Sequence, residues 1–306
     1  MTMFEAILLT IITASTPLVI AAMGELVTER SGVLNLGVEG MMIIGAVCAF
    51  IATNMTGSPY LGVLAGIATG ALFSLLFGFL TLTLVANQVA TGLALTILGL
   101  GVSGMVGEGV VGVPGVKMQP IVIPLLSDIP VIGPILFAQD LFFYLSILLV
   151  AGVNWYLFKS RSGLKLRAIG DSHGSAHTLG LSVIRTRYLA VMFGGACAGL
   201  AGAQLSLVYT PQWVENMSAG RGWIALALVV FAAWRPWRLL AGGYLFGAVT
   251  IGQLHAQALG IGLPSQFLSA LPYAATIVVL IIISHNRRTT LINTPACLGK
   301  PFVPDR

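Results

Sequence analysis

The stretch LGVLAGIATGALFSLLFGFLTLTLV, residues 61–85, decides the fold because it is apolar throughout and carries no charge. A helix that crosses the hydrocarbon core of a bilayer needs about 20 mostly apolar residues. A second charge-free stretch, YLAVMFGGACAGLAGAQLSLVY, covers residues 188–209. The 306-residue chain is 57% hydrophobic and only 8% charged, whereas soluble domains carry roughly 25% charged residues. We infer that lipid covers much of its surface.

The same criterion along the whole chain predicts an all-α polytopic membrane protein with about nine transmembrane helices, in a range of about eight to ten. The N-terminus lacks a basic segment, so the first apolar stretch is expected to be a retained span and not a cleaved signal peptide. All the spans form one transmembrane domain, residues 1–288, followed by a tail at 289–306. The expected spans are 4–27, 33–54, 60–85, 88–107, 140–158, 188–210, 220–234, 239–258 and 269–284.

The distribution of Lys and Arg predicts the orientation of the spans. The segment 159–187 holds six basic residues and one acid, Asp171, which favours the cytoplasm. Counting spans from this loop puts the N-terminus outside and the C-terminus and tail inside. The net charge of +5 is therefore attributed to orientation and not to nucleic acid binding. An odd span count also permits an inverted repeat of two four-helix halves, spans 1–4 and 6–9.

The segment 108–139 falls outside in this orientation. It is rich in proline and glycine, and proline prevents a long regular helix. We expect an ordered extracytoplasmic segment that lies on the membrane and is not a separate domain.

Small residues in the sixth span predict tight helix packing. Gly195, Gly199 and Gly202 lie at spacings of three and four residues, which let helix backbones approach closely. Packing is favoured over a direct contact with a ligand.

Polar residues within the spans are candidates for a solute path. Asn35 and Glu39 are four residues apart and share a helix face. A structural tie of Glu39, to Arg30 or a basic loop residue, is favoured because Glu39 falls nearer the cytoplasmic end than the midplane. The amides suit an uncharged hydrogen-bonding solute as well as they suit interhelical bonds. The candidate path residues are Asn35, Glu39, Asn87, Gln88, Thr91, Gln204, Gln253 and Gln257.

The cytoplasmic loop predicts a short helix. Asp171 or Ser172 can cap its start, and Gly180 suits the position after its end. Such a helix is a docking element for a partner. His173 and His177 share its face, but no third ligand lies nearby and we predict no metal site. The three cysteines, Cys48, Cys197 and Cys297, give neither a disulfide framework nor a metal spacing.

Sequence motifs for nucleotide binding and hydrolysis are absent. Gly299 and Lys300 are followed by Pro301, so no P-loop is present and the chain is not expected to bind ATP. No His-Glu-x-x-His motif occurs, and no enzyme is predicted.

The cytoplasmic loop resembles that of the permease subunits of bacterial ABC importers for branched-chain amino acids, simple sugars and nucleosides. The family pattern is Ala-x-Gly-x-Asn, Ala-Ala and Gly-Ile-x-Val. Here Asp171 stands for the usual Asn, Ser175 for an Ala and Leu181 for an Ile. The segment GELVTERSGVLNLGVEGMM, residues 24–42, is similar to the nucleoside-type permeases. The matching residues in the loop are Ala168-Ile169-Gly170-Asp171, Ser175-Ala176 and Gly180-Leu181-Ser182-Val183.

The resemblance implies the partners. Such permeases work in pairs, here as the smaller member of a heterodimer, in the bacterial inner (plasma) membrane. Cytosolic ATP-binding subunits dock on the loop helices and hold the ATP and Mg, so this chain binds no cofactor. An extracytoplasmic binding protein or lipoprotein delivers the solute. The residues expected to couple the chain to the ATPase are Gly170, Asp171, Ser172, His173, Ser175, Ala176, Leu179 and Gly180.

The expected solute is a nucleoside or nucleobase. A simple sugar, riboflavin or an amino acid is the alternative within the same machinery. An ion-coupled secondary transporter is less favoured because it needs a midplane carboxylate, for which Glu39 is the sole candidate. A channel or a structural membrane subunit is the third alternative.

Overall fold

The computed structural model describes residues 3–304 apart from 125, 128, 130–131 and most of 259–292, where only 264, 266, 267, 270, 271, 274, 275, 277, 278 and 281 are described. Its elements are α1 Met3–Arg30, α2 Val38–Thr56, α3 Pro59–Gly78, the π-helix η1 Phe79–Thr83, α4 Gln88–Gly107, the 3-10 helix η2 Glu108–Val110, β1 Ile121–Val122, α5 Ile132–Phe137, β2 Ala138–Gln139, α6 Leu141–Lys159, α7 Arg161–Asp171, α8 His173–Thr178, α9 Val183–Gln204, the π-helix η3 Leu205–Tyr209, α10 Arg221–Phe231 and α11 Pro236–Ala258.

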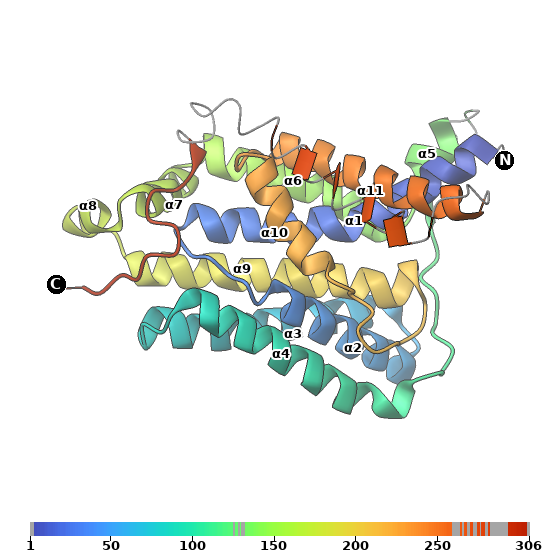
Figure 1. The fold of residues 1–306 in the computed structure, drawn as a ribbon, viewed down its shortest axis with the longest axis horizontal. Coiled ribbons are helices and arrows are strands. Elements are labelled where there is room, and N and C mark those ends of the chain that lie inside the picture. Colours follow the sequence, from blue (N-terminus) through green and yellow to red (C-terminus); the bar gives the residue numbers. More distant parts are fainter. Residues whose placement is uncertain are drawn as a thin grey trace.

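Helices long enough to cross a membrane dominate this fold, as the sequence predicts. Seven helices in the described part of the chain have the required length and apolar composition. They correspond to the first six predicted spans and the eighth. The N-terminus lies at one end of the bundle, and the C-terminus lies at the other end beside α8 (Figure 1). The side of the membrane that each end faces stays a prediction.

The expected seventh span, 220–234, differs from the structure. Only the 11 residues of α10 are helical there, which is too short to cross a bilayer alone. Positive φ angles at Ala233 and Trp234 turn the chain, and Pro236 then begins α11. The ninth predicted span, 269–284, lies mostly outside the described residues, so the count of nine stays a prediction.

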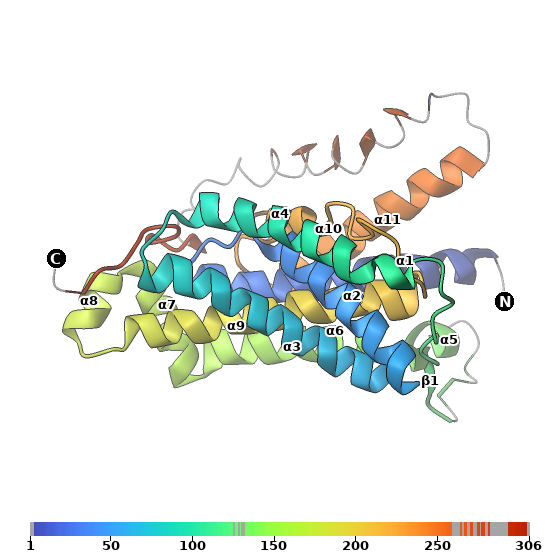
Figure 2. The same cartoon turned by 90° about the horizontal axis from the view of Figure 1, so that it is seen from below.

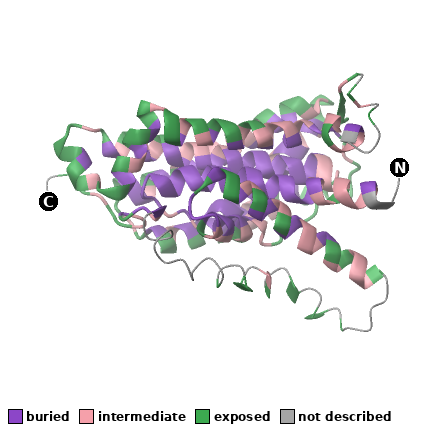
Figure 3. Cartoon of the chain, turned by 90° about the horizontal axis from the view of Figure 1, so that it is seen from above, coloured by how far each residue is buried: buried purple, intermediate pink, exposed green. Residues whose placement is uncertain are grey.

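Three helices form the centre of the bundle. Side chains of α1, α2 and α9 are mostly buried, whereas α3, α4, α6 and α11 expose leucine, phenylalanine and tryptophan on their outer faces (Figure 3). Such an apolar exterior is what a lipid environment requires.

Glycines let the central helices approach closely. A Cβ added at Gly199 would meet the carbonyl oxygen of Gly66 on α3, and one added at Gly202 would meet that of Met42 on α2. A Cβ at Gly195 would meet Ser74 and the carbonyl of Gly70. The small residues of α9 therefore lie at the contact of α2, α3 and α9.

The segment after α4 contains only short elements. β1 and β2 pair antiparallel, with Ile121 opposite Gln139 and Val122 opposite Ala138. Together with α5 they lie at the end of the bundle that holds the N-terminus (Figure 2). Asp140 caps α6 by accepting a hydrogen bond from the N–H of Phe143 at 3.0 Å. Burial raises the pKa of its carboxyl group.

Candidate functional site

A buried carboxylate joins two helix starts inside the bundle. Glu39, in the first turn of α2, is 3% exposed. Its Oε1 accepts hydrogen bonds from the Ser218 hydroxyl at 2.6 Å and the Gly220 N–H at 2.8 Å, and its Oε2 accepts one from the Gly222 N–H at 2.6 Å. The carboxylate therefore takes up the free N–H groups at the start of α10, where the helix dipole favours a negative charge.

Glu39 lies deeper in the bundle than the sequence analysis expected. Its neighbour Gly40 packs against Leu95, Thr96 and Gly99, in the middle of α4. The expectation of a site near one end is wrong because residues 31–37 are not helical. An extended residue advances about 3.3 Å and a helical one only 1.5 Å, so this short segment returns far into the bundle.

The expected tie of Glu39 to Arg30 is also absent. Arg30 donates to the carbonyl of Trp234 at 3.1 Å. The indole N–H of Trp234 in turn donates to Glu29 at 2.6 Å. These two hydrogen bonds fix the C-terminal end of α10 at the last turn of α1. Helix α10 therefore runs only from the middle of the bundle to the end where α1 finishes.

The segment 210–220 brings the chain from the end of η3 back to the bundle centre. Trp213 is fully buried beside Gly107 at the end of α4, Glu215 approaches Gly104, and Ser218 reaches Glu39. Non-helical backbone is tolerated at membrane depth only where protein or a water-filled cavity surrounds it. Here Trp213 and Ser218 are buried, whereas most of the segment between them is exposed.

Several predicted path residues support the other non-helical segment, 31–37. Gln88 accepts from the N–H of Leu34 at 2.8 Å, and Asn35 accepts from the N–H of Gly37 at 2.9 Å. The N–H of Asn35 donates to Glu25 at 3.2 Å. The side chains of Asn35 and Gln88 thus serve the backbone.

The remaining candidates on α4 lie at its start. Asn87 is exposed and caps the helix by accepting from the N–H of Ala90 at 3.0 Å. Thr91 is half-buried one turn further on. Neither is near the contact of Glu39 with α10, which lies level with the middle of α4.

A cavity of about 330 Å³, lined mostly by apolar residues with a few polar side chains, opens between α1, η3, α10 and α11. Gln253 lines it, and Gln257 is half-buried one turn further along α11. Gln204 is buried nearby on α9 and donates to the carbonyl of Thr13 at 3.2 Å. The residues that line the cavity include Leu18, Tyr209, Arg221, Thr250 and Gln253.

Arg221 also lines this cavity, but it is not among the path residues predicted from the sequence. Its guanidinium lies 4.9 Å from the centre of the Tyr209 ring, and it also donates to the carbonyls of Met217 and Ser218. Its approach to Thr250 and Gln253 of α11 could not be read from the sequence.

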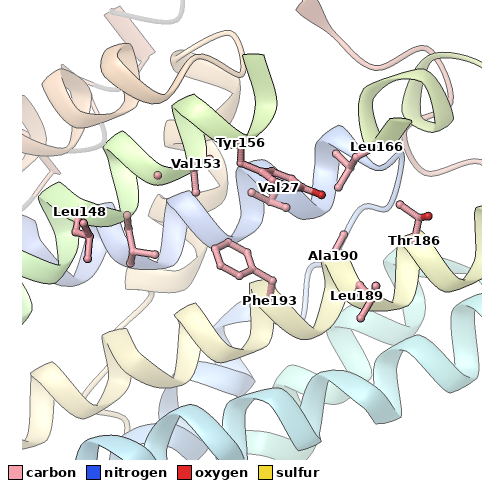
Figure 4. A pocket seen from close by; sticks show the side chains of 11 residues that line it. Val27, Leu148, Val153, Tyr156, Leu166, Thr186, Leu189, Ala190 and Phe193 are labelled. Atoms are coloured by element: carbon pink, nitrogen blue, oxygen red, sulfur yellow. The ribbon is translucent and has the colours of Figure 1, made fainter. Parts of the chain in front are cut away.

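A larger groove of about 500 Å³ between α6 and α9 is almost entirely apolar. Figure 4 shows Val153 and Tyr156 of α6 facing Ala190 and Phe193 of α9 across it. It contains none of the predicted path residues, and its lining suits hydrocarbon better than a polar solute.

The structure forms a helix, α8, in the predicted coupling loop. Ser172 caps it by accepting from the N–H of Ser175 at 3.4 Å, and Gly180 follows it with a φ of 79°. Ala176 is buried against Ile169 and Val183. Leu179, by contrast, is 80% exposed, and Asp171 is exposed as well.

The C-terminal residues pack against this loop, which the sequence analysis did not foresee. The ring of Phe302 lies 5.2 Å from that of His173 and 5.4 Å from that of His177. The N–H of Cys297 donates to the carbonyl of Gly170 at 2.9 Å. Burial, and then the charges of Arg187 and Lys300, lower the pKa of His173.

Arg187 fastens three segments at this end of the bundle. It is 1% exposed and donates to the carbonyls of Ser31 at 3.1 Å and Lys300 at 3.3 Å. Its third nitrogen lies 3.2 Å from Nδ1 of His173. Among the residues that the structure describes, no group of three His, Cys, Asp or Glu side chains could hold a metal ion.

Comparisons with known proteins agree with these features. Residues 7–283 match the family described as branched-chain amino acid transport system / permease component. A putative glucose ABC transporter permease of Haloferax volcanii is 41% identical over 94% of each chain. No solved structure matches the chain.

Two nucleoside permeases are also similar. The guanosine ABC transporter permease NupQ of Bacillus subtilis is 34% identical over 86% of this chain and 87% of its own. The nucleoside ABC transporter permease NupC of Lactococcus lactis is 36% identical over 87% and 88%. The part of the chain that the structure describes holds seven long apolar helices. The chain belongs to this family of ABC transporter permeases, the multi-pass subunits of the plasma membrane.

Proposed function

We propose that this ABC permease imports a nucleoside or nucleobase. The cavity lined by Tyr209, Arg221 and Gln253 is the observation that carries the proposal. Its volume of about 330 Å³ falls within the range of small-molecule sites, about 300–1,000 Å³. The amide and the guanidinium supply hydrogen-bond donors for the oxygen and nitrogen atoms of a base.

A nucleoside is favoured by the combination of these groups. The Tyr209 ring and the planar Arg221 guanidinium offer flat surfaces on which a base can stack. The amide of Gln253 offers both a donor and an acceptor to its edge. The relatives NupQ and NupC carry guanosine and nucleoside in their names.

A simple sugar is the second candidate. The observation that favours it is the Haloferax volcanii relative, which is named as a putative glucose permease and is 41% identical to this chain over the aligned residues. Uptake of radiolabelled guanosine and of glucose, in cells that lack the gene and in cells that carry it, tests the two. Gene-dependent guanosine uptake is expected; gene-dependent glucose uptake without guanosine uptake would contradict the nucleoside.

A matched pair of variants tests whether the cavity is part of the solute path. Gln253→Leu removes the hydrogen-bonding amide but keeps similar volume, and we expect it to lower guanosine uptake about tenfold or more, as expected when a polar contact to the solute is lost. Gln257→Leu makes the same chemical change one turn away and serves as the control. Equal uptake by the two variants would remove Gln253 from the path.

We propose that α8 docks on an ATP-binding subunit. The exposed Leu179 and a cavity of about 300 Å³ beside it, lined in part by His177, Arg185 and Phe302, support the proposal. ATP and Mg²⁺ would then be held by that partner and not by this chain. A second permease and an extracytoplasmic binding protein complete the proposed importer, on the strength of the family resemblance.

Leu179→Asp tests the docking. The side chain is exposed, so the variant should insert normally but lose stimulation of the partner's ATPase by the solute-loaded binding protein. Ser162→Asp adds the same charge at an exposed position of α7 and should retain it. Full coupling in the Leu179 variant would refute the docking role of α8.

A further inference from the structure

A cavity of about 390 Å³ lies where α6 ends and α11 begins. Asn154 and Phe158 of α6 form one side, and Arg235, Trp237 and Arg238 form the other together with Pro236. Figure 1 shows these two helix ends beside each other. We call this the basic cavity. It is separate from the proposed solute cavity, which lies between α1, η3, α10 and α11.

Positive charge gathers around the basic cavity. Arg235 and Arg238 are exposed, and neither guanidinium has a hydrogen-bond or carboxylate partner among the described residues. The stretch 259–292 contains no Asp or Glu. Arg167 lies 5.1 Å above the ring of Phe158. The charges of Arg167 and Arg235 both act on Arg30, where Asp171 opposes them. An anion would relieve this repulsion.

Two exposed tryptophans mark the depth of the cavity. Trp155 of α6 is 63% exposed and Trp237 of α11 is 52% exposed. Tryptophan at such positions gathers at the level of the lipid head groups. The cavity also lies between the last turn of one spanning helix and the first turn of another. Its guanidinium groups therefore lie where lipid phosphates are.

We propose that the basic cavity binds the phosphate head group of an anionic phospholipid in the leaflet at the α8 end of the bundle. Guanidinium groups bind phosphate oxygens in a bidentate manner, and basic pockets between helices are suited to lipid head groups. Phe158 and the Trp237 ring supply apolar surface for the glycerol backbone. Asn154 supplies an amide for a head-group hydroxyl.

Native mass spectrometry of the full chain, released from nanodiscs that contain phosphatidylglycerol and phosphatidylcholine, tests the proposal. The wild-type protein should retain phosphatidylglycerol in preference to phosphatidylcholine. The double variant Arg235→Gln/Arg238→Gln should weaken this retention about tenfold or more, since each basic residue near the surface contributes to anionic lipid binding. Arg185→Gln removes one exposed positive charge from the same end and should leave it unchanged.

Further arms separate the sources of phosphate and guard against misfolding. Arg235→Lys/Arg238→Lys keeps the charge that orients the helices and should bind lipid more weakly than wild type, because lysine cannot form the bidentate contact. Displacement of the lipid by inorganic phosphate would assign the cavity to a free anion and overturn the proposal. Equal retention by the wild-type protein and the Arg235→Gln/Arg238→Gln variant would overturn it too.

Discussion

The starts of α2 and α10 solve the same problem in different ways. Each helix begins inside the bundle after a non-helical segment, 31–37 for α2 and 210–220 for α10. In the segment before α2, a backbone N–H group finds its acceptor nearby: the side chain of Asn35 accepts a hydrogen bond from the N–H of Gly37. The start of α10 is satisfied by Glu39, a residue more than 170 positions away in the sequence.

The difference shows which helix depends on the rest of the fold. The turn before α2 forms from residues two apart, although Glu25 and Gln88 also contribute to it. The start of α10 is complete only when α2 is in place beside it. Two discontinuous helices that run in opposite directions from a shared contact are what the predicted inverted repeat would produce, and the repeat itself stays a prediction.

Replacing Glu39 with Ala should break this contact with the largest effect. Three donors would lose their acceptor in a buried site, at a cost of about 3–5 kcal/mol. The apparent melting temperature of the detergent-solubilised protein should fall strongly, or the protein should fail to accumulate. Glu39→Gln keeps one acceptor oxygen and should fall between. A melting temperature of Glu39→Ala equal to wild type would disprove the capping role.

Gly222→Ala should be the next most harmful change. Its added Cβ would lie 2.7 Å from atoms of Glu39 and push the two helix starts apart. Overpacking of this kind lowers the free energy of unfolding by about 1–3 kcal/mol. Gly220→Ala is the control, because open space surrounds that position and only its φ of 82° opposes a side chain, at about 1 kcal/mol. The same thermal assay should rank Gly222→Ala below Gly220→Ala; the reverse order would argue against the close approach.

Asn35→Ala tests the local side of the comparison. It leaves the Gly37 N–H without its acceptor, at about 1–2 kcal/mol, and should therefore lower the melting temperature less than Glu39→Ala. Asn35→Asp keeps the acceptor and is the matched variant. A larger loss for Asn35→Ala than for Glu39→Ala would reverse the ranking of the two helix starts.

The smallest effect is expected from pH at α8, which lies outside the membrane-spanning helices. The pKa of His173 is lowered below its ordinary value of 6.5, so its protonated form is disfavoured in the folded arrangement. The packing of residues 297–302 on α8 should be fully stable above about pH 6.5 and weaken as pH falls through the lowered pKa. Hydrogen exchange in 297–302 at about pH 7.5 and 5.5 measures this. The quantity compared is the protection of these amides, relative to the exchange rate of an unfolded chain at the same pH. His173→Gln should abolish the pH dependence of this protection. A dependence that survives would exclude His173 as its source.

The sequence predicted the long helices well because a charge-free apolar stretch of sufficient length has few other structures available. It also predicted a helix at α8, where Ser172 and Gly180 mark the two ends. It could not predict that α10 stops after 11 residues, because the hydropathy of 220–234 does not reveal where the chain turns. The predicted depth of Glu39 was wrong for a related reason. Composition does not distinguish an extended segment that leads back into the bundle from the first turns of a helix.

The contacts of Arg187 could not be predicted from the sequence for another reason. In the sequence it counts as one of six basic residues that orient a loop. In the structure it is buried and holds Ser31, His173 and Lys300 together, residues that belong to three separate segments. Long-range contacts of this kind are absent from any local pattern.

The packing of residues 297–302 against α8 has a consequence for biogenesis. These residues leave the ribosome after every helix described here has been made. A chain that terminates early can insert its helices but lacks the Phe302 ring and the Cys297 contact beside the coupling loop. The surface of α8 is therefore completed only after residues 297–302 have been made, later than all the described helices, so that a product truncated before them would present this surface unfinished.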